Sequence, residues 1–344
     1  APQDFDLIAT EFHRWVRDHE DRLGLHKSED FVRFIDRDFA FYAHWYERLR
    51  AAANTLTPGL ERIFFLAEHN FTLRYPVLLA PLRVDDSDDI IQRKLRVTAA
   101  FMDILVHRRI WNWRAIDYST MQYAMFLVMR DIRGKAPSDL AHLLRQRLDA
   151  ETETFETNTG FRLHGMNGRQ IHRLLARMIE FVETGSGMPS HYTEYAKRGG
   201  KGAYEIEHIW ADHPERHADE FSHPSDFAEY RNRIGDLLLL PKSFNASYGD
   251  LTYEKKLVHY DSQNLLARSL HENAYEHNPG FLRFREETGL PFRPHREFRK
   301  ADVDARQELY RQLAAHIWNP TRLAQEASGD DAAVAPQPAT LTST

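Results

Sequence analysis

One short segment of the sequence places a carboxylate directly before an imidazole. Residues 204–210 read YEIEHIW, so Glu207 and His208 stand among Tyr, Ile and Trp residues, which favour a β-strand. Neighbouring side chains leave a strand on opposite faces. A Glu-His pair at the end of a strand can therefore straddle a substrate, with one residue holding a metal ion while the other transfers a proton.

A second pair of polar residues follows within RIGDLLLLPKSFNASYG, residues 233–249. Asp236 begins an apolar run that is predicted to be a strand over 236–240, and Asn245 lies in the helical turn that comes after it. A hairpin of the two strands would bring both residues next to the Glu-His pair. Carboxylate and amide oxygens suit Mg²⁺ or Mn²⁺ better than zinc, and two protein ligands leave positions for water and phosphate oxygens.

Other catalytic motifs fail in their spacing or composition. The chain contains no cysteine, which excludes disulfides, cysteine-ligated zinc and a cysteine nucleophile. HENAYEH at 271–277 places its histidines six residues apart, whereas the helix of a zinc protease needs them four apart. RGGKG at 198–202 lacks the frame of a phosphate-binding P-loop. Zinc proteases and P-loop NTPases are therefore not expected.

The motifs that remain resemble the ββα-metal module of HNH endonucleases, and more narrowly the C-terminal nuclease domain of the GmrSD-type restriction family. That family carries an acidic residue and His followed by Ile, then Ile-Gly-Asn-Leu-x-Leu-Leu, an Asn, and a Phe/Tyr-x-x-Lys element. The resemblance is close over residues 204–260, and within the family it is nearest to SspE-type anti-phage effectors, which are linked to phosphorothioate DNA. The matching residues here are Glu207, His208, Ile209, Ile234, Gly235, Asp236, Leu237, Asn245, Tyr253 and Lys256.

The resemblance implies a role for each residue of the two motifs. His208 would be the general base that takes a proton from the attacking water, since neutral imidazole has a suitable pKa near pH 7. Glu207 and Asn245 would hold one Mg²⁺ or Mn²⁺, which stabilises charge on the phosphorane and the departing 3′ oxygen. Asp236 stands where many members have an Asn that braces the histidine loop. An ionised Asp can only accept hydrogen bonds, so it could instead add charge near the metal.

Basic residues on either side of the motifs are predicted to contact the DNA backbone. Lys197, Arg198 and Lys201 lie in a glycine-rich loop just before the first strand, where positive charge can bind phosphates without regard to base sequence. Lys255 and Lys256 follow the second strand; the alternative for these two is a solvated helix face. The chain as a whole has a net charge of −6, which does not favour DNA binding over the entire surface.

The elements that must position these residues are predicted to be mainly helical. Apolar spacing over the first ~190 residues predicts a helical bundle, and a change of composition near Thr184 marks the start of the nuclease module. We predict a mainly α fold with a helical scaffold over 1–185, a ββα-metal (HNH) module with flanking helices over 186–290, a helical extension over 291–326 and a disordered tail over 327–344. Helices are predicted at 4–23, 28–54, 88–112, 119–132, 137–149, 168–183, 225–233, 279–287 and 302–318.

The leading functional hypothesis is a Mg²⁺- or Mn²⁺-dependent endonuclease acting on double-stranded phage DNA in restriction or antiviral defence. Because a single ββα site cuts one strand at a time, we expect a nickase. An inactive HNH-like module that binds DNA or a protein is the alternative, with Asp236 marking the loss of activity. A helical adaptor in which the His and Asn residues are unrelated is a third possibility.

The cellular location of the protein and its missing domain are predicted from features that the sequence lacks. No apolar run approaches the ~20 residues of a membrane span, and the start shows no signal-peptide pattern, so a cytoplasmic protein without membrane contact is expected. The family's N-terminal NTP-hydrolysing domain, with its Asp-Gly-Gln-Gln-Arg signature, does not occur in the sequence. We therefore expect the chain to be the C-terminal part of a longer protein that carries such a domain.

Overall fold

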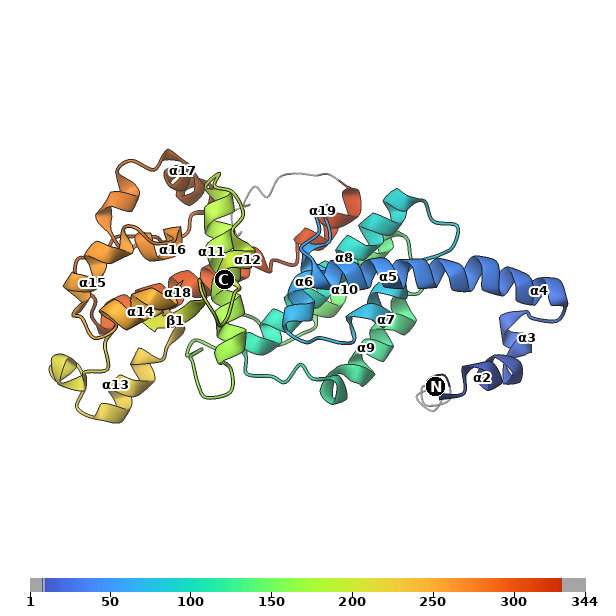
Figure 1. Cartoon of the computed structure of the whole chain (residues 1–344), viewed down its shortest axis with the longest axis horizontal. Coiled ribbons are helices and arrows are strands. Elements are labelled where there is room, and N and C mark those ends of the chain that lie inside the picture. Colours follow the sequence, from blue (N-terminus) through green and yellow to red (C-terminus); the bar gives the residue numbers. More distant parts are fainter. Residues whose placement is uncertain (1–7, 9, 330–344) are drawn as a thin grey trace.

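The protein consists of a helical bundle and a smaller part built around two strands, at opposite ends of the molecule (Figure 1). The structure is a computed structural model, which describes residue 8 and residues 10–329 except for the side chain of Asn245. The described residues contain a single two-stranded sheet, so the predicted mainly α fold is confirmed. Of the predicted disordered tail, residues 327–328 belong to helix α19 (Arg322–Ser328), and residues 330–344 lie outside the described part.

The bundle is organised around one long buried helix, α8 (Asp88–Trp111). Ser87 caps its start by accepting a hydrogen bond from the backbone N–H of Ile90 at 3.4 Å, and acidic residues in its first turn complement the helix dipole. No helix of the described residues is long and apolar enough to cross a membrane. The other bundle elements are α2 (Phe12–Asp18), α3 (Glu20–Leu23), α4 (Ser28–Arg33), π-helix η1 (Phe34–Phe39), α5 (Ala40–Asn54), α6 (Glu61–Glu68), α7 (Arg74–Leu79), α9 (Tyr118–Ile132) and α10 (Pro137–Asp149).

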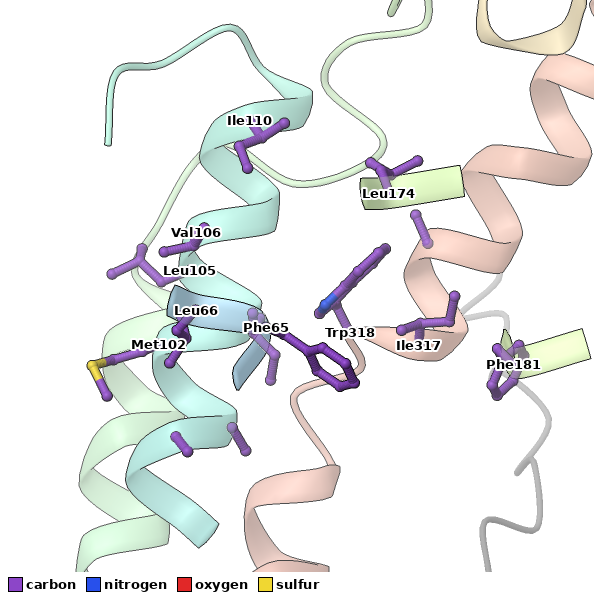
Figure 2. Close-up of a cluster of buried hydrophobic side chains, with 14 of the residues drawn as sticks. Phe65, Leu66, Met102, Leu105, Val106, Ile110, Leu174, Phe181, Ile317 and Trp318 are labelled. Carbon is purple, nitrogen blue, oxygen red and sulfur yellow. The ribbon is translucent and has the colours of Figure 1, made fainter. Parts of the chain in front are cut away.

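Helix α11 (Gly168–Gly185) and the chain end that follows α18 (Lys300–Ile317) connect the bundle to the strands. Figure 2 shows Trp318 between Phe65 of the bundle and Leu174 of α11, within one buried apolar cluster. The Trp318 indole also stacks on the imidazole of His107, with ring centroids 4.0 Å apart. The apolar core therefore continues across residue 185, where the sequence predicted a domain boundary.

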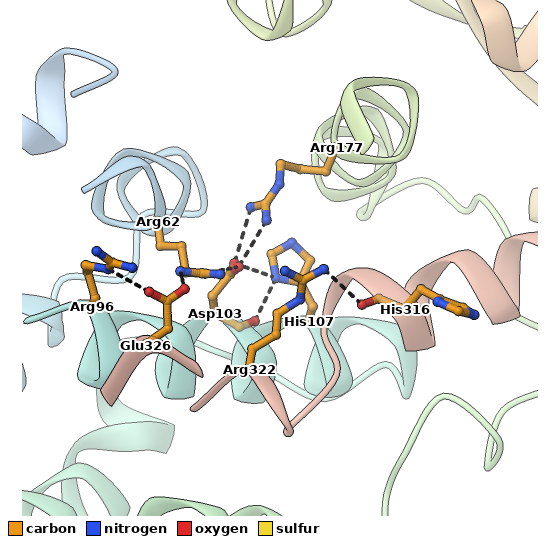
Figure 3. Close-up of polar contacts among 8 residues, drawn as sticks. All are labelled: Arg62, Arg96, Asp103, His107, Arg177, His316, Arg322 and Glu326. Atoms are coloured by element: carbon orange, nitrogen blue, oxygen red, sulfur yellow. Dashed lines mark hydrogen bonds and ion pairs between the residues drawn. The ribbon is translucent and has the colours of Figure 1, made fainter. Parts of the chain in front are cut away.

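Ion pairs fasten the C-terminal helix α19 to the bundle. Glu326 lies between two arginines, 2.5 Å from Nη1 of Arg62 and 2.7 Å from Nε of Arg96 (Figure 3). Beside them, the buried carboxylate of Asp103 accepts a hydrogen bond from Nη2 of Arg177 at 3.1 Å, which joins α8 to α11. The segments before and after the strands are thus held against the same bundle.

The two strands pair in antiparallel fashion and separate two apolar cores. Strand β1 (Tyr204–His208) pairs with β2 (Leu237–Pro241), with Glu207 opposite Leu238 and His208 opposite Leu237. Leu237 and Leu239 join the main core, whereas Leu238 and Leu240 pack in a second core with Trp210 and other aromatic residues. This alternation follows from the two-residue period of a strand, and it explains why all four leucines of β2 are buried.

Short helices surround the strand pair (Figure 1). Gly235 lets the turn before β2 approach α18 closely, because a Cβ atom there would lie 2.3 Å from the carbonyl oxygen of Val303. The elements of this part are α12 (Tyr192–Tyr195), η2 (Pro214–His217), α13 (Pro224–Arg231), η3 (Ile234–Asp236), α14 (Lys242–Tyr248), α15 (Tyr253–Tyr260), α16 (Leu265–Arg268), η4 (Glu272–Tyr275) and α17 (Pro279–Thr288).

Candidate active site

Strand pairing brings the two polar motifs of the sequence together. The backbone N–H of Ile209 donates to the carbonyl oxygen of Asp236 at 2.8 Å, and that of Trp210 donates to the Asp236 carboxyl at 3.2 Å. His208 is the last residue of β1, so these bonds hold the chain immediately after it. The hairpin expected from the sequence is therefore present at the end that carries the Glu-His pair.

The imidazole of His208 is held by an asparagine that the sequence analysis did not single out. Its Nε2 lies 3.2 Å from Oδ1 of Asn232, while Nδ2 of Asn232 donates to the carbonyl oxygen of Ala228 at 2.8 Å. The second bond fixes the orientation of the amide, so Nε2 of His208 carries the proton and Nδ1 keeps its lone pair. No hydrogen bond to Nδ1 is found among the described residues.

Burial keeps the His208 ring neutral. Its removal from water, together with the positive charge of Arg231, lowers the pKa of His208 to about 4. At neutral pH the ring is therefore uncharged and able to accept a proton at Nδ1.

Glu207 points to the other face of β1 and forms a buried ion pair. Its side chain is only 7% exposed, and Nζ of Lys256, on α15, lies 2.6 Å from Oε1. The same ammonium donates to the carbonyl oxygen of His208 at 2.9 Å. Burial raises the pKa of Glu207, and the charge of Lys256 opposes that rise. Lys256 thus lies inside the protein, and the phosphate contact predicted for it would require its ammonium to leave these partners.

Asp236 is completely buried at the end of η3, directly before β2. Burial raises the pKa of its carboxyl well above the usual range, although the hydrogen bond from Trp210 opposes this. Burial therefore works against the ionised form that was predicted to add charge near a metal, and that role of Asp236 stays a prediction. A protonated carboxyl has an acceptor oxygen and an O–H donor, so like an asparagine amide it can both accept and donate hydrogen bonds.

Asn245 lies in α14, which packs against both strands. The side chain of Asn245 is outside the described residues, so its predicted meeting with Glu207 stays a prediction. Within the described part there is no cluster of three or more His, Asp or Glu side chains arranged to hold a metal ion. A site with one carboxylate and one amide oxygen does not need such a cluster, because Mg²⁺ completes its shell with water and phosphate oxygens.

The two oxygens of the Glu207 carboxylate have different surroundings. The second oxygen of Glu207, Oε2, accepts no hydrogen bond from any described residue, and its partner oxygen already binds the cationic Lys256. The Glu207 carboxylate therefore already binds one cationic group, and its role as a metal ligand stays a prediction.

The other basic residues predicted to contact DNA are exposed, unlike Lys256. Lys197, Arg198 and Lys201 lie before β1, and Lys255 is on the outer face of α15. The loop is shaped by glycines 199, 200 and 202, whose positive φ angles favour a residue without a side chain. Nζ of Lys197 donates to the carbonyl oxygen of Lys201 at 2.6 Å, which closes the loop. The structure thus leaves these charges at the surface, where DNA could reach them.

Comparison with known proteins places this site in a family. The model for the C-terminal domain of GmrSD restriction endonucleases matches residues 141–313, which is half of the chain. The chain belongs to that family. The GmrSD match begins in α10 and ends in α18, so it includes both strands together with part of the bundle. Neither the curated proteins nor the solved structures contain a match. Membership in the GmrSD family makes this a restriction-type nuclease domain, with DNA as its substrate.

Proposed function

We propose that the chain is a metal-dependent HNH endonuclease domain in which His208 activates the attacking water. The observation that carries this proposal is the state of the His208 ring. It is neutral, it is fixed by Asn232, and its Nδ1 lone pair is available at the end of β1. A general base must be unprotonated and placed to accept a proton, and His208 meets both conditions; its pKa of about 4 lies below the value near 7 expected from the sequence, which makes it a weaker base than a free imidazole.

The remaining residues of the site have supporting roles. Glu207 and Asn245 would hold one Mg²⁺ or Mn²⁺, which supplies a positive charge that stabilises the phosphorane and the departing 3′ oxygen. Nδ1 of His208 takes the proton of the water, and Asn232 keeps the ring in the required tautomer. Asp236 supports the chain after His208 through its bond to Trp210. Lys197, Arg198, Lys201 and Lys255 bind the DNA backbone through charge.

The alternative of an inactive HNH-like binding module depended on Asp236 replacing the family's asparagine. Burial raises the pKa of Asp236, and a protonated carboxyl can both accept and donate hydrogen bonds as that asparagine does, which supports the active enzyme. The position of α14 directly after the antiparallel strands supports a ββα-metal module. A single such site cuts one strand, so the product on a plasmid is the nicked circle.

The wider role follows from the family and is part of the proposal. We infer that the domain nicks phage DNA as the C-terminal part of a cytoplasmic restriction effector, joined to an NTP-hydrolysing domain. We further propose that it acts as SspE-type effectors do, which are linked to phosphorothioate DNA. Comparing nicking of phosphorothioate-modified and unmodified plasmids tests that assignment; equal rates on the two substrates would remove it.

Plasmid nicking tests the catalytic proposal. Supercoiled plasmid should be converted to the nicked form in the presence of Mg²⁺ or Mn²⁺, and excess EDTA should stop the reaction. A purified chain that binds plasmid but leaves it supercoiled with either ion would favour the inactive module. Undiminished nicking in EDTA would exclude a metal-dependent mechanism.

A further inference from the structure

The buried ammonium of Lys256 is bound to the same carboxylate that is proposed to hold the metal ion. Both partners are withdrawn from water: the Lys256 side chain is 1% exposed and that of Glu207 is 7% exposed. The contact of 2.6 Å is a charge-assisted hydrogen bond in a region of low dielectric. Glu207 is therefore already neutralised by a positive charge that belongs to the protein.

Two cations at one buried carboxylate repel each other, and this repulsion is strong where water cannot screen it. The position of the Lys256 ammonium therefore decides whether Glu207 can bind a divalent ion. If its ammonium stays on Oε1 of Glu207, a divalent ion bound to the same carboxylate is disfavoured. If the ammonium moves away, Glu207 becomes a full ligand.

The surroundings of Lys256 allow it to move without losing every partner. Its ammonium also donates to the carbonyl oxygen of His208 at 2.9 Å, so one strong acceptor remains when Glu207 is given up. The next residue on the same face of α15 is Tyr260, whose hydroxyl is buried and has no hydrogen-bond partner among the described residues. Buried polar groups are usually paired, so this hydroxyl has unused hydrogen-bonding capacity, and it is near enough to interact with the charges of Glu207 and Asp236.

We propose that Lys256 is an internal competitor that occupies Glu207 and must release it before a divalent ion binds. This inference rests on the proposed metal-dependent function and adds to it a positioning residue that sets the affinity for the ion. The opposite role, in which Lys256 holds Glu207 in the conformation needed for the ion, predicts the opposite change when the charge is removed.

Calorimetric titration of the full chain with Mn²⁺ separates these possibilities. The variant Lys256→Met keeps the length and apolar stem of the side chain but removes its charge. We expect it to bind Mn²⁺ at least about tenfold more tightly than the unsubstituted chain, equivalent to about 1.4 kcal/mol. The matched control is Lys135→Met, which removes an exposed charge from a loop of the bundle and should leave the affinity unchanged. Adding Glu207→Gln to Lys256→Met should abolish the gain.

A second measurement needs no substitution, and so decides the question even if Lys256→Met does not fold. Amine-reactive labelling followed by mass spectrometry reports how accessible each lysine is. An ammonium that has lost one of its two bonded partners leaves the interior more often, so labelling of Lys256 should rise when Mn²⁺ is added, while that of Lys255 stays constant. The rise should disappear in Glu207→Gln.

The outcomes are distinct. Tighter Mn²⁺ binding by Lys256→Met, or increased labelling of Lys256 with Mn²⁺, supports the competitor role. Equal or weaker binding by a folded Lys256→Met, or unchanged labelling in a chain that binds Mn²⁺, overturns that role and leaves the proposed nuclease function in place. Absence of Mn²⁺ binding by both proteins, with DNA present and absent, overturns the metal-dependent function and this inference with it.

Discussion

Replacing Asp236 by asparagine should stabilise the protein near neutral pH and change how its stability depends on pH. The carboxyl group is fully buried, its one hydrogen bond from a described residue comes from the backbone N–H of Trp210, and burial raises its pKa well above the usual value of 3.8. An asparagine has nearly the same shape, can accept the same hydrogen bond and is neutral at every pH.

The size of the effect follows from proton linkage. At a pH between the unfolded and folded pKa values, the folded chain keeps a proton on Asp236 that the unfolded chain has lost. Raising the pH in this window therefore lowers the free energy of unfolding, by about 1.4 kcal/mol per pH unit from this group. The loss begins above the unfolded pKa and stops once the pH exceeds the folded pKa. Asp236→Asn should lack this contribution entirely.

Urea unfolding at about pH 5, 6 and 7 measures the difference. The stability of Asp236→Asn relative to the unsubstituted chain should increase by about 1.4 kcal/mol per pH unit until the folded pKa is reached. Asp250→Asn, which changes an exposed carboxylate, is the matched control and should show no such slope. The variant should also retain plasmid nicking.

Two results would refute this reasoning. A stability difference that stays constant with pH would mean that Asp236 has the same protonation in the folded and unfolded chain. A variant that is less stable at every pH would mean that the carboxyl makes a contact which an amide cannot replace.

Three further predictions concern the base, the ion-pair network and the loop. Asn232→Ala removes the acceptor of the imidazole proton, so nicking should fall about 10²-fold while circular dichroism and DNA affinity persist; unchanged turnover would show that the tautomer is set by something else. Arg177→Met leaves the buried Asp103 carboxylate without its main partner. The free energy of unfolding, measured in urea, should fall by about 3–5 kcal/mol. A fall of less than about 1 kcal/mol would contradict a buried ion pair. Replacing Lys197 and Lys201 by Gln should weaken DNA binding and reduce the slope of log affinity against log salt by about 2, and an unaltered slope would place the loop away from the DNA.

Sequence reasoning succeeded where the local pattern decides the structure. The helical spacing over 88–112, 137–149 and 168–183 corresponds to α8, α10 and α11, whose ends differ from the prediction by at most two residues. The polar motifs were placed at strand ends, because β-favouring residues surround one and an apolar run follows the other. The GmrSD family was also recognisable, since its pattern depends on short fixed spacings.

Short elements without clear periodicity were not predicted. Helices α6 and α7 lie in an apolar region, 61–79, where Pro76 interrupts the pattern and where apolar residues face several directions. Helix α19 was not separated from the predicted extension, because its position depends on the distant partners of Glu326. In each case tertiary packing, rather than local preference, makes the segment helical.

The chemistry of the site was predicted only in part, for a related reason. The types of the site residues are readable in sequence, but their partners come from other elements. Asn232 reaches His208 from the end of α13, and Lys256 reaches Glu207 from α15 across the second core. Lysine in a charged helical stretch is typically solvated, so the burial of Lys256 required knowledge of how that helix packs. The neutral state of Asp236 likewise depends on burial that a sequence does not report.

The central claim is that the imidazole at the end of β1 is the base for DNA cleavage, and plasmid nicking by His208→Ala tests it most directly. His223→Ala removes an exposed imidazole from the same part of the protein and serves as the control. With Mg²⁺ present, His223→Ala should nick as fast as the unsubstituted chain, whereas His208→Ala should be folded, bind DNA and leave the plasmid supercoiled. Full nicking by a clean preparation of His208→Ala would contradict the account.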